Sequence, residues 1–402
     1  MANADGHNVQ WKKVRFDEFF SMLPTNTLSR DKLNSQRGAY QNIHYGDVLI
    51  KYPFCLDCDK YDIPYINEDV KFNATEVKDG DVIFADTAED DTVGKCVEVL
   101  NVGDRKIVSG LHTYFCRPKY KLALGYLGFF LNSNHFHNQL LPYIAGSKVS
   151  SVNRTSIART YISYPDSLPV QRRIAAILSA ADKVIEQTRQ LISKYKSIKQ
   201  GMMEDLLKPK EGWKKVKLGE IIVDSYAGGT PNRSRDDYFG GDIPWVTSGE
   251  VNNPTIQSTI ENITTSGFNS SSARWIPQNS ILVALYGATA GQVSLLKIKA
   301  TSNQAVLAVI PNKEETDTEF LYYSIVYNKE KLLFLAQGSG QPNLSKNIVD
   351  RLELLIPGLP AQRRIAKMLS GIDRKIEAEE KVLEKYEKMK KGLMERLLKE
   401  NT

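Results

Sequence analysis

Residues Leu168–Leu207 read LPVQRRIAAILSAADKVIEQTRQLISKYKSIKQGMMEDLL, and residues Leu359–Leu398 read LPAQRRIAKMLSGIDRKIEAEEKVLEKYEKMKKGLMERLL. When the two stretches are aligned without a gap, about half of the roughly 40 positions are identical, which is far more than chance gives. The chain therefore contains an internal repeat, and the fold is expected to contain the same unit twice.

Both copies of the repeat are predicted to be long helices. Pro169 and Pro360 stand where the first turn of a helix tolerates proline, and no other proline follows in either copy. Apolar residues recur at alternating steps of four and three, which is the spacing of a coiled-coil seam. At about 1.5 Å per residue, each helix is expected to be roughly 55 to 60 Å long. The predicted seam consists of Ile174, Leu178, Ile185, Ile192 and Tyr195 in the first copy, and of Ile365, Leu369, Ile372, Ile376, Leu383 and Tyr386 in the second.

Polar side chains interrupt the seam at matching places, where Thr188 corresponds to Glu379 and Lys199 corresponds to Lys390. Such residues either fix the register and orientation of a helix pair, or simply face water near a frayed end. A second apolar stripe exceeds what one seam needs and predicts a surface for a further partner. Its members are Ile177, Val184, Ile198, Met203, Leu207, Met368, Met389, Met394 and Leu398.

Each helix follows a globular segment, called a head below, and the two heads share short motifs. The first head opens with Trp11-Lys12-Lys13-Val14, and the second opens with Trp213-Lys214-Lys215-Val216. The stretch 63–70, IPYINEDV, also resembles the stretch 243–251, IPWVTSGEV. The remaining head sequences differ, so we expect one fold with two different surfaces.

Short apolar runs bounded by turn residues predict strands inside the heads. Examples are Asp47–Ile50, Asp81–Phe84 and Ser280–Ala284, whereas 122–134 and 319–335 are predicted to be helical. The fold class is therefore α+β, with two similar mixed α/β heads. The expected domains are a head at 1–165, a helix at 166–208, a second head at 209–357 and a second helix at 358–402.

Charge is distributed unevenly along the chain. The formal net charge is +6, of which about +3 lies in the first helical segment and about +4 in the second, so the heads are close to neutral. Phosphate neutralisation dominates the affinity of nucleic-acid binders, so near-neutral heads predict weak DNA binding without partners. No apolar run approaches the length of a membrane span and the first ten residues are polar, so we expect a soluble, cytoplasmic protein outside the membrane.

Neither the cysteines nor the sequence motifs that we searched for give a clear indication of a catalytic or metal site. Cys55 and Cys58 form a C-x-x-C that could be half of a zinc site or a redox pair, but no second pair of ligands follows. Buried free thiols are the favoured interpretation, and Cys96 and Cys116 lie singly in strand-like runs. The chain has no Pro-Pro, no G-x-x-x-x-G-K-[ST] loop and no H-E-x-x-H helix. We therefore expect no catalytic residue, no metal and no cofactor.

The head–helix–head–helix order, the L-P-x-Q-R-R-I-A helix openings, the W-K-K-V head openings and the segment GDIPWVTSGEV together resemble the specificity subunit of type I restriction-modification systems. The resemblance covers essentially the whole chain. It implies that each head is a target-recognition domain for one half of a bipartite double-stranded DNA site, and that the two helices pack as an antiparallel coiled-coil spacer with a pseudo-two-fold repeat. It also implies two methyltransferase (modification) subunits and translocase–nuclease (restriction) subunits as partners, with S-adenosylmethionine bound by the methyltransferase.

Candidate DNA-contacting residues are polar side chains on predicted loops, because base edges are read by hydrogen bonds. Polar loop residues that only face water have the same chemistry, so not every candidate is expected to contact DNA. In the first head the candidates are Lys51, Tyr52, Asp86, Thr87, His112, Thr113, Ser147 and Lys148; in the second they are Thr230, Asn232, Arg233, Arg235, Thr247, Ser248, Tyr286, Thr289, Asn303, Gln304, Ser339 and Gln341.

Two other functions fit some of these features. The chain could be a helical interaction scaffold whose heads bind proteins and read no DNA sequence. It could also be a self-contained DNA-modifying enzyme, against the missing motifs. A two-part DNA consensus would argue against the first alternative, and methyl transfer by the chain alone would support the second.

Overall fold

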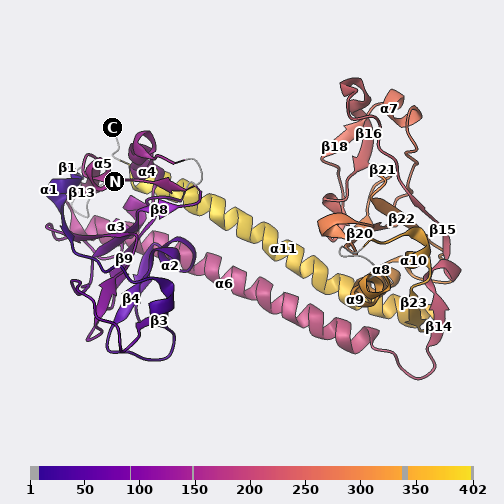
Figure 1. Ribbon diagram of the computed structural model, residues 1–402, viewed down its shortest axis with the longest axis horizontal. Coiled ribbons are helices and arrows are strands. Elements are labelled where there is room, and N and C mark those ends of the chain that lie inside the picture. Colours follow the sequence, from indigo (N-terminus) through magenta and orange to yellow (C-terminus); the bar gives the residue numbers. More distant parts are fainter. Residues whose placement is uncertain (1–8, 91, 147–148, 337–342, 400–402) are drawn as a thin grey trace. The chain divides into compact units, whose positions relative to one another are not determined.

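The computed structural model describes residues 9–90, 92–146, 149–336 and 343–399 (Figure 1). The chain divides into two compact units, one formed by Met1–Arg189 with Lys381–Thr402 and the other by Gln190–Glu380. Each unit therefore contains one head and part of each long helix. Among the described residues, no helix is long and apolar enough to cross a membrane.

The first head is built on a five-stranded sheet with the strand order β2-β11-β7-β9-β5. β5 runs parallel to β9, and the other neighbours are antiparallel. The strands are β2 (Phe20–Leu23), β11 (Thr113–Pro118), β7 (Val82–Ala85), β9 (Cys96–Leu100) and β5 (Cys55–Asp57). A second sheet has the order β10-β4-β6-β3, with β10 parallel to β4. Its strands are β10 (Ile107–Ser109), β4 (Gln41–Ile43), β6 (Tyr65–Ile66) and β3 (Leu33–Asn34).

The second head repeats this arrangement. Its five-stranded sheet has the order β15-β22-β19-β20-β17, again with one parallel neighbour pair at the same edge. The strands are β15 (Ile222–Ala227), β22 (Val306–Pro311), β19 (Ile281–Ala284), β20 (Val293–Leu296) and β17 (Thr255–Ile256). The second sheet has the order β18-β16-β21, with β21 parallel to β16. Its strands are β18 (Glu261–Ile263), β16 (Phe239–Val246) and β21 (Thr301–Ser302).

A two-stranded ribbon closes the base of each head, where the chain enters and leaves it. β1 (Trp11–Arg15) pairs with β13 (Tyr161–Pro165), and β14 (Lys214–Lys217) pairs with β23 (Glu353–Ile356), both antiparallel. The W-K-K-V motif thus forms the same strand twice. A further pair in the first head joins β8 (Thr87–Ala88) to β12 (Ser150–Ser151).

Short helices cover the sheets. The first head contains α1 (Phe16–Phe19), α2 (Tyr45–Ile50), α3 (Tyr126–Leu131), α4 (Asn134–Leu140), α5 (Arg154–Ile157) and the 3-10 turns η1 (Arg30–Lys32) and η2 (Leu141–Tyr143). The second contains α7 (Thr265–Asn269), α8 (Thr318–Tyr327), α9 (Lys329–Leu335), α10 (Lys346–Asp350), η3 (Leu218–Glu220), η4 (Asp236–Tyr238), η5 (Glu250–Asn252) and η6 (Gly287–Thr289). The prediction of two similar mixed α/β heads with two long helices is confirmed.

One local prediction was wrong, and one sequence resemblance does not correspond to structural equivalence. The run 47–50 lies in the helix α2, not in a strand, because His44 caps that helix by accepting a hydrogen bond from the Gly46 amide. A four-residue apolar run does not distinguish a strand from a short helix. The stretch 63–70 contains β6, whereas 243–251 contains the end of β16, which occupies the place of β4. The true counterpart of 245–251, WVTSGEV, is therefore 42–48, NIHYGDV.

The two long helices are α6 (Leu168–Leu207) and α11 (Leu359–Leu397). Each begins with a fully buried glutamine that fastens the helix to its head. The Gln171 side chain accepts from the Ala123 amide at 2.8 Å and donates to the Pro165 carbonyl at 2.7 Å. The Gln362 side chain accepts from the Asp317 amide and donates to the Pro357 carbonyl, both at 2.9 Å. This is the physical role of the glutamine in L-P-x-Q-R-R-I-A.

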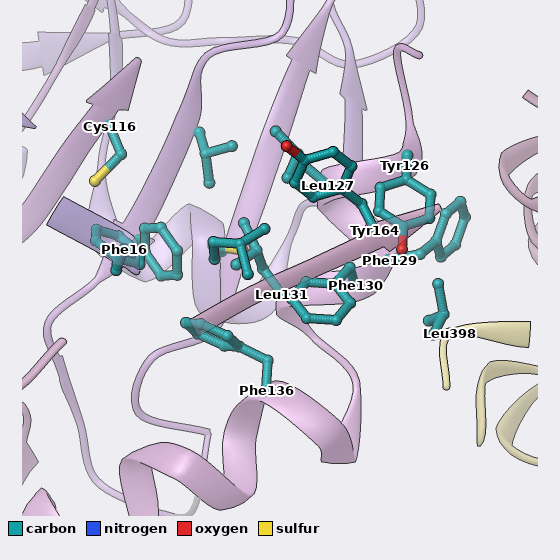
Figure 2. Close-up of a cluster of buried hydrophobic side chains, with 14 of the residues drawn as sticks. Phe16, Cys116, Tyr126, Leu127, Phe129, Phe130, Leu131, Phe136, Tyr164 and Leu398 are labelled. Atoms are coloured by element: carbon teal, nitrogen blue, oxygen red, sulfur yellow. The ribbon is translucent and has the colours of Figure 1, made fainter. Parts of the chain in front are cut away.

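The last turn of each long helix completes the core of a head. Met394, Leu397 and Leu398 at the end of α11 are buried in the core of the first head, together with Ile174 near the start of α6. Figure 2 shows Leu398 beside the aromatic cluster that includes Phe129. In the second head, Leu207 from the end of α6 is buried with Ile365 and Leu369 from the start of α11. Each head core therefore needs the beginning of one helix and the end of the other.

This packing corrects the prediction for the second apolar stripe. Its C-terminal members, Leu207, Met394 and Leu398, are at most 8% exposed and belong to the head cores, so they offer no surface to a partner. Four other members remain on the surface of the helices: Val184, Ile198, Met368 and Met389 are 37% to 51% exposed.

Within each unit, α6 and α11 pack antiparallel along the predicted seam. In the first unit Lys390 Nζ binds Asp182, and Arg189 binds Glu387 at 2.6 Å. Residue numbers therefore increase along one helix as they decrease along the other. The seam side chains are buried or half-buried, as are Thr188 and Glu379. Lys199 binds Asp373 at 2.7 Å in the second unit, and its side chain is only 20% exposed. The polar seam residues Lys199 and Lys390 are therefore ion-paired between the helices rather than solvated at a frayed end.

Candidate nucleic-acid interface

Loops from both sheets meet at one edge of each head. In the first head the Asp86 amide, just after β7, donates to the His112 carbonyl, just before β11, at 3.2 Å. In the second head the Leu285 amide, just after β19, donates to the Ala305 carbonyl, just before β22, at 2.8 Å. The same hydrogen bond thus closes the same end of both five-stranded sheets, and we call this end the loop edge.

The second sheet of each head brings further loops to the loop edge. The Gly110 amide donates to the Ile43 carbonyl at 3.0 Å, and the Asn303 amide donates to the Val246 carbonyl at the same distance. These bonds place the residues that follow β4 and β10 beside each other, and likewise the residues that follow β16 and β21. Parallel neighbours have their carboxyl ends at the same side of a sheet, which explains the convergence.

A third connection brings in the loop near the start of each head. The Asn26 amide donates to the Ser109 carbonyl, and the Gly229 amide donates to the Ser302 carbonyl, both at 2.9 Å. Three hydrogen bonds therefore occur at matching places in two heads of different sequence. They give a residue-by-residue correspondence at the loop edge that the sequence alone does not provide.

Several predicted residues of the second head lie together at this edge. The Thr230 hydroxyl hydrogen-bonds the Gln304 side chain, which joins two of the predicted loops. Asn303 accepts from the Ala305 amide at 3.1 Å through its side chain. Asn232 instead holds its own loop, accepting from the Ser234 amide and hydroxyl at 3.1 and 2.8 Å.

Four more predictions of the second head fall on neighbouring loops. Thr247 and Ser248 follow β16 and are half-buried, and the Thr247 hydroxyl donates to buried Glu250 at 3.0 Å. Tyr286 follows β19 and is 37% exposed, and Thr289 lies in the turn η6 just beyond it. Of these side chains, Tyr286 offers the most open surface.

Arg233 is the most constrained charged side chain of this region. Its guanidinium lies 4.7 Å from the centre of the Phe239 ring and 4.9 Å from that of the Trp245 ring. The Glu261 carboxylate accepts from both terminal nitrogens, at 2.6 and 3.3 Å. Trp245 is itself buried and donates from its indole nitrogen to the Gly229 carbonyl at 3.0 Å. The arginine is therefore stacked and clamped on a fixed platform.

In the first head the predicted residues Asp86, Thr87 and His112 form one group at the loop edge. The Thr87 hydroxyl donates to Asp86 at 2.7 Å, and the His112 ring nitrogen lies 3.4 Å from the same carboxylate. The Tyr45 ring meets the His112 ring edge to face, with centroids 5.4 Å apart. A polar cluster with one exposed aromatic side is suited to base edges.

Other predicted residues of the first head are placed differently. Tyr52 is 2% exposed and donates to the Asp62 carbonyl at 3.2 Å, and Thr113 is 5% exposed with its hydroxyl bonded to Ser109. Buried hydroxyls cannot meet a base, so neither is kept as a contact residue. Lys51 follows the far end of α2 and also bonds the Asp62 carbonyl. The candidates Ser147, Lys148, Ser339 and Gln341 lie outside the described residues.

Sequence reasoning missed Tyr45 and Arg30 at the loop edge, and the buried His44 beside them, which the correspondence with the second head identifies. Burial lowers the pKa of His44, and the nearby charge of Arg30 lowers it further. The imidazole therefore stays neutral, which leaves its Nδ1 free to accept from the Gly46 amide at 3.2 Å. The misplaced alignment of 63–70 hid His44 and Tyr45, because it kept 42–48 from being matched with 245–251.

The cysteines of the first head are free thiols, of which Cys58, Cys96 and Cys116 are buried and Cys55 is half-buried. Burial raises the pKa of Cys58 to about 11 and raises that of Cys55 well above its ordinary value. Among the residues that the structure describes, no three His, Cys, Asp or Glu side chains are grouped so that they could hold a metal ion. The C-x-x-C therefore has no further ligands beside it in this part of the chain.

Comparison with known proteins gives one consistent result. The family model for the type I restriction modification DNA specificity domain matches twice, at residues 8–196 and 210–388. A Methanocaldococcus jannaschii protein assigned as the MjaX specificity subunit of a type I restriction enzyme is 28% identical over 334 residues, covering 79% of this chain and 77% of that protein. The EcoR124I/EcoR124II specificity subunit of Escherichia coli is 29% identical over 243 residues, covering 55% of this chain and 58% of that one.

A solved structure shares the fold. The crystal structure of the S subunit of a type I restriction-modification system from M. genitalium has a TM-score of 0.62 at 15% identity, covering 98% of both chains. The likeness therefore extends over both heads and both helices.

Proposed function

The chain belongs to the type I restriction modification DNA specificity family, and from this premise we propose that each head reads one half of a two-part DNA target. The observation that carries the proposal is the loop edge. It is assembled by the same three backbone hydrogen bonds in both heads, yet it carries Tyr45, Asp86 and His112 in one and Thr247, Tyr286 and Gln304 in the other. Equal scaffolds with unlike polar surfaces are suited to reading two different half-sites.

The helix pair serves, on this proposal, as the spacer that sets the gap between half-sites. A helix of 40 residues is roughly 60 Å long and stiff, whereas a flexible linker of equal length would allow variable spacing. The buried glutamines Gln171 and Gln362 support this role because they fix each head to the helix that follows it.

Methyl transfer and DNA cleavage are assigned to partner subunits, two methyltransferase subunits and the translocase–nuclease subunits of a type I complex. The exposed apolar residues Val184, Ile198, Met368 and Met389 on the long helices support a docking role for these helices. Apolar surface on a helix face is typical of helix-mediated docking. Because the heads are close to neutral, binding to DNA is expected to be weak and salt-sensitive until partners join.

The test is a random-oligonucleotide selection on the chain co-purified with its methyltransferase partner. We expect two short conserved elements separated by a gap of fixed length. Replacement of residues 1–165 by another head of the family should change one element and preserve the other element and the gap. A selection that yields no consensus would leave an interaction scaffold without sequence reading as the function.

A further inference from the structure

Two arginines occupy equivalent places at the two loop edges. The Asn26 amide bonds the Ser109 carbonyl and the Gly229 amide bonds the Ser302 carbonyl, which makes Asn26 and Gly229 equivalent. Four residues after each of these comes an arginine, Arg30 in the first head and Arg233 in the second. The sequences between these points differ, so the match appears only once the strands are superposed by their hydrogen bonds.

Both arginines are held in the same way. Asp47 accepts from the two terminal nitrogens of Arg30 at 2.9 and 2.7 Å, and Glu261 accepts from the two terminal nitrogens of Arg233 at 2.6 and 3.3 Å. The two side chains are equally open, at 52% and 53% exposed. The carboxylates come from different elements, the helix α2 and the strand β18, so the arrangement is not a simple consequence of similar sequence.

The clamp leaves one edge of each guanidinium uncommitted. A guanidinium has five N–H donors, and two of them are used by the carboxylate. Within the described residues, neither Arg30 Nε nor Arg233 Nε donates to the protein. The Nε–H and the adjacent terminal N–H therefore form a pair of parallel donors on the side away from the carboxylate.

A second arginine of the same loop shows the opposite arrangement. Arg235 donates through Nε and one terminal nitrogen to Asp237, at 2.7 and 2.8 Å, so its paired-donor edge is already occupied. Arg15 at the base of the first head is bound in the same closed manner by Asp17, at 3.1 and 2.8 Å. These residues are natural controls, because they carry the same charge without the free edge.

We propose that Arg30 and Arg233 are specificity-determining residues, each reading one guanine in the half-site of its own head; this rests on the proposed function. Guanine presents two acceptors, O6 and N7, side by side in the major groove, and they match a pair of parallel donors. Contact with a backbone phosphate needs only charge and tolerates a mobile side chain. The carboxylate clamps of both arginines, and the stacking of Arg233 on Phe239 and Trp245, instead fix the guanidinium before DNA arrives, which lowers the entropy lost on binding.

The experiment compares Arg233→Lys with Arg235→Lys in the complex of the full chain with its methyltransferase partner. Lysine keeps the charge but lacks the paired donors. We expect Arg233→Lys to lower the preference for one guanine of the second head's half-site by roughly ten- to a hundred-fold, leaving the other half-site unchanged. Arg235 was among the predicted contacts, but Asp237 occupies its paired donors, so we expect it to read no base and Arg235→Lys to leave the consensus as it is. Arg30→Lys and Arg15→Lys form the matching pair for the first head.

Each result bears on the proposal separately from the general function. Retention of the full consensus in Arg233→Lys would overturn it, because the pair with Glu261 would then be structural only. An equal loss of affinity for every sequence would also overturn it, because that is the behaviour of a phosphate contact. Continued reading of the first half-site shows that the variant complex is folded. Absence of any two-part consensus in the unmodified complex would instead contradict the proposed function itself.

Discussion

The two heads contain the same five-stranded sheet, but the N-terminus of the helix beside it, α3 in the first head and α8 in the second, is capped differently. In the first head Glu98 of β9 pairs with Val82, and in the second Leu295 of β20 pairs with the equivalent Ile281. One register position therefore carries a buried acid in one head and a buried leucine in the other.

The difference follows from how the helix start is capped. The Glu98 carboxylate accepts from the Gly125 and Gly128 amides, both at 2.8 Å, and so satisfies the free N–H groups at the start of α3. Gly125 has φ of 88°, a left-handed conformation in which no side chain could serve as a cap without strain. In the second head Asp317 caps α8 locally by accepting from the Phe320 amide at 3.0 Å. A local cap leaves the strand free to carry an apolar side chain, whereas the first head depends on a buried carboxylate.

The largest expected effect concerns the completion of each core by a helix end. Leu398 and Leu207 are equivalent in the repeat and are 1% and 5% exposed. Leu398→Ala should destabilise the first head, and Leu207→Ala the second, each by about 2 to 5 kcal/mol because a buried leucine is replaced by a cavity. All four cysteines lie in the first head and three of the four tryptophans lie in the second, so thiol labelling and tryptophan fluorescence in urea report the heads separately. Equal loss in both signals for either variant would contradict the assignment of each helix end to one head.

The next effect is a pH dependence that only the first head should show at this position. Burial raises the pKa of Glu98 from 4.5 to about 7. The folded state therefore holds its proton more tightly than the unfolded state, so this contribution is complete below pH 4.5 and is lost as the pH rises through 7, by roughly 3 kcal/mol. Glu98→Gln cannot titrate, and its amide nitrogen cannot accept one of the two hydrogen bonds that the Glu98 oxygens accept. The variant should therefore be the less stable protein at pH 5 and should gain roughly 3 kcal/mol relative to the unmodified chain by pH 8.

The comparison of Glu98→Gln with the unmodified chain is needed because His44 acts in the opposite direction. Its lowered pKa makes the folded first head lose stability as the pH falls below the ordinary value of 6.5. The difference between the two proteins in thiol labelling removes this contribution, since His44 is present in both. A difference that is the same at pH 5 and pH 8 would show that Glu98 does not change its charge in this range.

Periodicity and duplication predicted the parts of the fold that rest on many residues at once. The seam from Ile174 to Tyr386 and the buried runs of β7 and β19 repeat a simple pattern, which makes them readable from sequence. The loop edge rests on single backbone hydrogen bonds, such as that from Asn303 to Val246, which leave no pattern of side chains. The alignment of IPYINEDV with IPWVTSGEV illustrates this difficulty. The two strings look alike, whereas the stretch 42–48, which is the structural counterpart of 245–251, has a less similar sequence.

The candidate interface residues also differ in how well the sequence predicts them. Arg233 was identified because its polar loop is also marked by the turn residues Gly228-Gly229-Thr230-Pro231, whereas Arg30 was missed because the polar residues around it are not marked in this way. Tyr52 was chosen for its residue type, although the neighbouring apolar residues place it in a core. Burial of a single side chain depends on contacts far away in sequence, so residue type alone decides it poorly.

The smallest expected effect concerns the ion pairs between the long helices, where the two copies of the repeat differ in sign. Arg189 binds Glu387 at 2.6 Å, and Lys196 binds Glu380 at 2.8 Å. In the repeat Arg189 corresponds to Glu380, and Lys196 to Glu387, so the charges are exchanged between the copies. An antiparallel pair of two α6 helices would place Arg189 opposite Lys196, and only α6 with α11 is complementary. Pairs of this kind set partner choice at little gain in stability.

A double-mutant cycle on Arg189 and Glu387 measures this preference. Glu387→Lys alone places two positive charges together, and adding Arg189→Glu restores an attractive pair with the signs reversed. We expect a coupling energy of about 0.2 to 1 kcal/mol from thiol labelling at low salt, because both side chains are about half exposed. The coupling should shrink at high salt, since exposed charges are screened. A cycle with no coupling at low salt would mean that the apolar seam alone makes each helix choose the other copy.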